Sequence, residues 1–151
     1  MIDVSAPIRT SYYSALNGNV TVTLPIDGST TIEVYSQVPD ETAYPYISIA
    51  DITEEGAGEA MTKDDPYATD VLVSLIIVTA FQTSEDNAEN KIADDIANAI
   101  LAIVLAATPL TFTGLKNKIS ILEESEYDTA RNDTHLVIAR KLVIRHVIGQ
   151  A

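Results

Sequence analysis

The feature that most constrains the fold is a β-branched segment that runs almost directly into a helical one. Residues 69–82 read TDVLVSLIIVTAFQ, with apolar side chains at both parities, so we expect a long strand covered on both faces. Residues 85–105 have helical spacing, with Ser84 as the expected N-cap and Pro109 beyond the end. A strand that feeds a long helix in this way predicts a small α+β domain.

The helical segment has one isoleucine stripe, made by Ile92, Ile96, Ile100 and Ile103. Asp94 and Asp95 fall on its outer face. From residue 99 to 107 the segment is apolar all round, which predicts a contact with a second surface. These nine residues are far fewer than the ~20 needed to span a bilayer, so no membrane segment is expected.

The remaining elements follow from alternation, turn residues and caps. We expect a short N-terminal helix capped by Ser5, a β-hairpin of strands 20–24 and 31–35 turning at Asp27-Gly28, and further strands at 46–52, 117–127 and 135–148. The fold class is α+β: a mainly antiparallel sheet with a β-hairpin, one long helix packed on it and a short N-terminal helix. Residues 1–151 form one domain, with no repeat or linker.

Charge is distributed unevenly over the 151 residues. The net charge is −13, and residues 40–95 hold fourteen acidic side chains against Lys63 and Lys91. Residues 116–151 are close to neutral, with a basic group at Arg140, Lys141 and Arg145. Binding to free nucleic acid is disfavoured, because phosphate recognition needs clustered cations. The N-terminal sequence lacks the basic and apolar regions of a secretory signal, so none is expected.

No pattern in the sequence predicts catalysis, a cofactor or a metal. The chain has no cysteine, and its two histidines, His135 and His146, differ in strand parity, so surface or hydrogen-bonded histidines are expected. Adjacent acids such as Asp64-Asp65 point to opposite sides of a strand and do not build a carboxylate pair. Glycine-rich phosphate loops and nucleophile elbows are missing from the sequence. We therefore expect a non-enzyme.

The segment 53–68 is predicted to be a long acidic loop or β-arm. It contains five acids, two glycines and a proline, with Met61 and Tyr67 as apolar groups that a partner could bind. Together with the helix end and the basic group, it supplies the predicted subunit or partner contacts: Glu54, Glu55, Glu59, Met61, Asp64, Asp65, Tyr67, Ile103, Leu105, Arg140, Lys141 and Arg145.

Three segments give the chain a resemblance to a known family. They are Tyr44-Pro45-Tyr46-Ile47 at the entry to a strand, the strand and helix of 69–105, and the acidic Glu123–Asp128 before the last strand. In their order and spacing they resemble the tail terminator, or tail completion, proteins of tailed bacteriophages.

The resemblance implies a structural virion protein made in the host cytoplasm. It would form a homo-oligomeric ring, hexameric or dodecameric, at the head–tail junction, with a central channel through which DNA passes without specific binding. Other tail, neck or portal proteins would be its partners. Such a ring needs two complementary surfaces on each subunit, which the acidic half and the basic group could supply.

Three alternatives stay open from the sequence. The first is a neck or connector ring protein of a short-tailed phage. The second is a small enzyme with buried carboxylates of raised pKa. The third is an acidic protein-binding module whose loop 53–68 recognises a basic partner.

Overall fold

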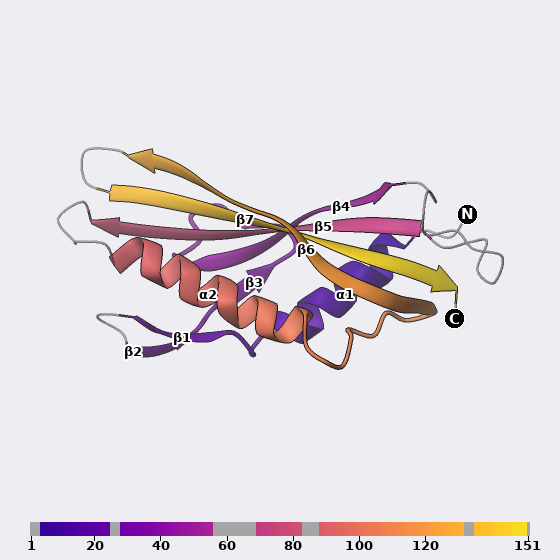
Figure 1. Cartoon of the computed structure of the whole chain (residues 1–151). Helices are drawn as coiled ribbons and strands as arrows, with labels where there is room; N and C mark the ends of the chain where they lie inside the picture. Colours follow the sequence, from indigo (N-terminus) through magenta and orange to yellow (C-terminus); the bar gives the residue numbers. More distant parts are fainter. Residues whose placement is uncertain (1–3, 25–27, 56–68, 83–87, 132–134, 151) are drawn as a thin grey trace.

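The computed structural model describes residues 4–24, 28–55, 69–82, 88–131 and 135–150. Seven strands and two helices occur in these ranges (Figure 1). In chain order they are α1 (Ser5–Leu16), β1 (Thr21–Leu24), β2 (Gly28–Thr31), β3 (Glu33–Tyr35), β4 (Tyr46–Glu55), β5 (Thr69–Gln82), α2 (Ala88–Val104), β6 (Leu115–Arg131) and β7 (His135–Gln150). The fold is α+β, as the sequence predicts.

The main sheet has five strands in the order β3-β4-β5-β7-β6. Neighbouring strands are antiparallel except β3 and β4, which are parallel. The strand β5 lies at the centre, where it pairs with β7 over its whole length, from Thr69↔Ile148 to Gln82↔His135. Both helices lie on the same side of this twisted sheet, and the small β1–β2 sheet lies beside α2 (Figure 1).

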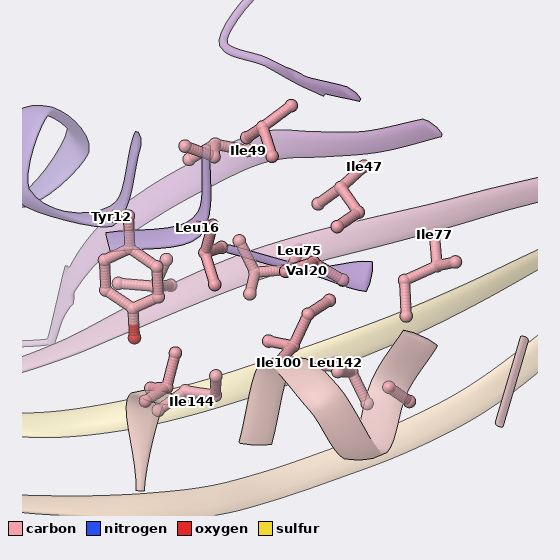
Figure 2. Close-up of a cluster of buried hydrophobic side chains, with 14 of the residues drawn as sticks. Tyr12, Leu16, Val20, Ile47, Ile49, Leu75, Ile77, Ile100, Leu142 and Ile144 are labelled. Atoms are coloured by element: carbon pink, nitrogen blue, oxygen red, sulfur yellow. The ribbon is translucent and has the colours of Figure 1, made fainter. Parts of the chain in front are cut away.

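The core fills the space between the sheet and this helical layer. From β5, Val71, Val73, Leu75 and Ile77 are fully buried, and α2 presents Ile96 and Ile100 to them. The helix α1 adds Ile8, Tyr12 and Leu16, which follow one another every four residues and therefore share one face. Figure 2 shows side chains from α1, β4, β5, β7 and α2 meeting in one cluster.

The predicted hairpin is wrong in its second strand. The strand β1 does turn back on a partner, but the partner is Gly28–Thr31, with Thr21↔Thr31 and Leu24↔Gly28 in register. Gly28 has a φ of 70°, which glycine adopts without strain. The chain then leaves this pair at Ile32 and enters the main sheet as β3. Ile32 and Val34 are both buried, whereas residues 28–31 are small and polar and add nothing to the core.

The helix start at the N-terminus also differs from the expectation. Ser5 is already the first helical residue, and Val4 occupies the cap position with no side-chain hydrogen bond to the helix. Val4 is buried, so packing rather than capping sets this helix start. The strands are longer than their patterns: β4 runs on to Glu55, so residues 53–55 are not loop, and β6 covers 115–131. Ser84 and residues 56–68 lie outside the described ranges.

The expectation that β5 is covered on both faces is wrong for the described part of the chain. The side chains that face α2 are fully buried. On the other side Leu72, Ile76 and Val78 are only half-buried, although Ser74 between them is buried. The described helices pack on one face only. The end of α2 is likewise incompletely covered, because Leu101, Ile103 and Leu105 are half-buried against the core while Ala102 is exposed.

Truncating the α2 stripe tests this one-sided core. Ile96→Ala should lower the free energy of unfolding by about 2–5 kcal/mol, because it removes apolar contacts and leaves a cavity. Asn98→Ala, on the exposed side of the same helix, should change it by less than about 0.5 kcal/mol. Urea titrations at one fixed protein concentration measure both. Equal effects of the two substitutions would contradict this core.

Candidate interaction surface

The side of the main sheet that faces away from both helices has no covering element among the described residues. We call it the open face. In an antiparallel ladder, directly paired residues share a face, so the pairs Leu72↔Arg145, Ile76↔Lys141 and Val78↔Ala139 lie together on it. The open face consists of Leu72, Ile76, Val78, Ala139, Lys141, Val143, Arg145 and Val147. Val143 is buried, and the other seven are half-buried.

The edge strand β6 extends this face. Ile119 pairs with Val147 and Ile121 pairs with Arg145, so both isoleucines point to the open side. They are 50% and 47% exposed, which is unusual for two isoleucines on neighbouring positions of one strand face. Apolar side chains on an uncovered sheet face are typical of protein–protein contact surfaces.

Arg145 carries a charge cluster at one end of the open face. Its guanidinium donates to Asp70 at 2.7 Å, to Glu123 at 3.0 Å and to Glu55 at 3.5 Å. The three carboxylates come from β5, β6 and β4, so one cation from β7 links four strands. Three acids around one cation leave this end of the face acidic.

Arg140 forms a second cluster on the helical side of the sheet. It donates to Asp94 of α2 at 2.5 Å, and its guanidinium carbon lies 5.0 Å from the ring centre of Tyr127. The Tyr127 hydroxyl also donates to Asp94, and this hydrogen bond is the main cause that raises the pKa of Tyr127. Asp94 was expected on the outer face of the helix, but it ties α2 to β6 and β7.

The basic group predicted from the sequence is therefore largely neutralised within the chain. Arg140 and Arg145 are paired with acids that are distant in sequence, and Lys141 is half-buried on the open face. Whether any of the three also contacts another subunit stays a prediction. Their spacing in sequence could not show these pairs, because the acids come from other strands and from α2.

A buried hydrogen-bond chain surrounds His146. The Tyr12 hydroxyl bonds His146 Nε2, and His146 Nδ1 lies 2.8 Å from Ser120 Oγ. Asn117 Nδ2 continues the chain to the carbonyl of Leu110 at 3.2 Å. Burial raises the pKa of Tyr12 well above its usual value, so its hydroxyl stays protonated and donates to Nε2. His146 is then the neutral tautomer that donates from Nδ1 to Ser120, an assignment that follows from the network.

This serine–histidine contact is poorly suited to catalysis. Burial lowers the pKa of His146 to about 4, so the imidazole is a weak base at neutral pH, and its Nδ1 hydrogen points to the serine oxygen. The arrangement instead joins α1 to β6 and β7. His146 is thus a hydrogen-bonded core histidine, one of the two outcomes expected from the sequence.

A shallow cleft of about 490 Å³ lies between α1 and β3. It is lined by Ala6, Arg9, Thr10, Tyr13, Glu33, Val34, Tyr35 and Ser36. The guanidinium of Arg9 is already used, because it donates to the carbonyls of Ile49 at 2.7 Å and Ala50 at 3.2 Å, beside the register shift in β4. Within the described residues, no group of three or more His, Cys, Asp or Glu side chains is arranged to hold a metal ion.

The remaining predicted contact residues fall in three places. Glu54 and Glu55 are exposed at the end of β4, and Ile103 and Leu105 are half-buried at the end of α2. Glu59, Met61, Asp64, Asp65 and Tyr67 lie outside the described residues. The open face itself was not predicted from the sequence. Its signal is the second set of alternating apolar residues in 69–82, to which Leu72, Ile76 and Val78 belong.

Comparisons with known proteins add no identification. No family model matches the chain, and no curated protein matches it in sequence. No helix in the described ranges is both long and apolar enough to cross a membrane.

Protonation of His146 should make stability depend on pH. The folded-state pKa, about 4, is below the ordinary 6.5, so the unfolded chain binds the proton more readily. The free energy of unfolding should therefore be independent of His146 protonation above pH 6.5. It should decrease as the pH drops from 6.5 toward 4, by up to roughly 3 kcal/mol. Denaturant unfolding between pH 7 and 4.5 should show a smaller fall for His146→Gln than for the natural chain. Equal falls would show that His146 is not the group responsible.

Loss of the Arg145 cation should destabilise the sheet. Arg145→Met keeps an apolar stem but leaves Glu55, Asp70 and Glu123 facing one another without their shared cation. The urea midpoint should fall further than for Lys141→Met, which removes a charge from the same strand and face. Added salt should narrow the difference, because it screens carboxylate repulsion. A difference that salt leaves unchanged would count against this electrostatic explanation.

Proposed function

We propose that this protein is a structural subunit of a homo-oligomeric ring at the head–tail junction of a tailed bacteriophage, a tail terminator through whose central channel DNA passes. The observation that carries the proposal is the open face. A five-stranded sheet with helices on one side leaves a broad surface with apolar side chains, and a second copy of the chain is the proposed cover.

Symmetry explains why such a surface suits a ring. A ring repeats one head-to-tail contact, so each subunit needs two different surfaces that fit each other. The open face is one, with an apolar centre and an acidic end around Arg145. The opposite side of the sheet is covered by the helices α1 and α2 (Figure 1). A single subunit therefore has two different surfaces, which a head-to-tail ring contact requires.

The order of elements supports the family expectation. The Tyr44–Ile47 segment leads into β4, the 69–105 segment is β5 followed by α2, and the Glu123–Asp128 segment lies in β6, directly before β7. Within the described residues, all three segments that carry the resemblance therefore lie on, or lead into, the main sheet and the long helix.

The charges fit a channel that does not retain DNA. The net charge is −13, and Arg140 and Arg145, the cations that looked available for phosphate, are bound to acids of the same chain. Phosphate binding needs cations that can release counterions from the DNA, so paired arginines contribute little. An acidic channel wall would let the polymer slide.

The ring is tested by mass. Native mass spectrometry at micromolar concentration and low salt should show a closed oligomer, with six or twelve subunits, and electron microscopy should show rings. Placing a charge on the apolar centre of the open face, as in Ile76→Glu, should shift the population toward monomer because the carboxylate would be buried on assembly.

The matched control is Asn98→Glu, which adds the same side chain to the exposed face of α2. Circular dichroism should show that both variants keep their fold. A natural chain that stays monomeric at these concentrations would overturn the ring. Rings that survive Ile76→Glu unchanged would exclude the open face as their contact.

A further inference from the structure

The strand β6 is a long edge with unusual charge order. It runs for 17 residues, and within the described residues its only partner strand is β7. Apart from Leu115, whose N–H donates to the carbonyl of Phe112, no described strand pairs with its other edge. Such an edge is a template for pairing with another strand. Most proteins shorten, cover or blunt edges of this kind.

The charges along β6 follow a distinct order: two lysines come first, four acids follow, and Arg131 is the last residue. Lys116 and Lys118 lie in its first third, and Glu124, Glu126 and Asp128 follow in its second half, all of them exposed. Between the two groups lie the exposed Ile119 and Ile121. From residue 116 to residue 128 the strand is thus basic, then apolar, then acidic, and Arg131 follows at its last position.

This order is complementary to itself when the strand is reversed. Two antiparallel copies of β6 related by a two-fold axis near Ile121 would place the basic end of each beside the acidic end of the other. The two copies of Ile121 would meet at the axis, where they would lose their exposure to water. Each Ile119 would face Glu123 of the other copy, with Ile121 of that copy as its diagonal neighbour. A parallel arrangement would instead place like charges together, which opposes pairing.

We propose that β6 is a self-association edge, whose partner is the β6 strand of a second copy in antiparallel orientation. The pairing would join two five-stranded sheets into one continuous sheet and satisfy the free peptide groups of both edges. It goes beyond the proposed ring, because an isologous contact closes at two subunits and cannot be the repeating contact of a ring. It would pair subunits in addition to any ring.

Edge protection alone does not explain the pattern. Charged side chains and bulges are common devices that stop edge pairing, and β6 has register shifts between Asn117 and Ile119 and between Leu122 and Glu124. Protection would work with the charges in any order, however, and would not favour two exposed isoleucines at the centre. The order of the charges from residue 116 to residue 128 and a central apolar pair are the features that self-pairing uses.

Charge exchange gives a test with an internal control. The double variants Lys116→Glu/Lys118→Glu and Glu124→Lys/Glu126→Lys each place like charges at both ends of the two-fold pair. Sedimentation velocity at low salt should show each variant pairing about tenfold more weakly, or worse, than the natural chain. An equimolar mixture of the two variants should pair again, because every facing group is then opposite in sign.

The outcomes separate this contact from the ring. Rescue in the mixture, with each variant alone impaired and normally folded by circular dichroism, supports antiparallel β6 pairing. A natural chain without two-fold pairing, variants that pair as well as the natural chain, or a mixture without rescue would each overturn it. Two-fold dimers without larger rings would contradict the proposed function and leave the β6 contact standing. Rings without two-fold pairing, unaffected by the charge substitutions in β6, would contradict the β6 contact and leave the proposed function standing.

Discussion

The structure depends on the burial of one face of β5 against the helical layer. Val71, Val73, Leu75 and Ile77 are fully buried there, and β4 and β7 align on either side of them. Because side chains alternate along a strand, every residue between these four is directed to the open face. Among the described residues one layer covers a strand that is apolar on both sides, and the exposed apolar surface follows from that.

Two arginines hold the outer parts of this arrangement. Arg145 gathers acids from three neighbouring strands, and Arg140 links the sheet to α2 through Asp94. Guanidinium groups suit this work because their fork of donors can meet several acceptors at once. The acidic excess of the chain is therefore partly structural: some carboxylates position strands, and those left over set the surface charge.

Much of the fold was predictable from spacing alone. The long strand at 69–82, the helix after it and the two final strands were predicted correctly, because the local spacing of their apolar residues is enough to identify them. The hairpin prediction failed at Ile32, because alternation continues smoothly from Thr31 to Tyr35 while the chain changes sheets between them. No residue pattern between Thr31 and Tyr35 indicates that the chain changes sheets there. The change is explained by the tertiary structure, in which Ile32 and Val34 are buried in the core.

The site was less predictable, since it consists of pairs formed by the tertiary structure. His146 could be classed as a hydrogen-bonded or surface histidine, but its partners Tyr12 and Ser120 lie 134 and 26 residues away in sequence. The ion pairs of Arg140 and Arg145 are similarly remote. Sequence reasoning treated these arginines as free charge, and the structure shows that they are matched.

The open face and the β6 edge share one physical origin. In the described part of the chain, both exist because the helices cover one side of the sheet and β7 pairs with one edge of β6. A second copy placed along β6 would continue the open face across the junction, so the apolar strip of Ile119 and Ile121 would become central in a surface twice as wide. Edge pairing would therefore enlarge the very surface that a ring contact would use, and the two contacts would reinforce rather than compete with each other.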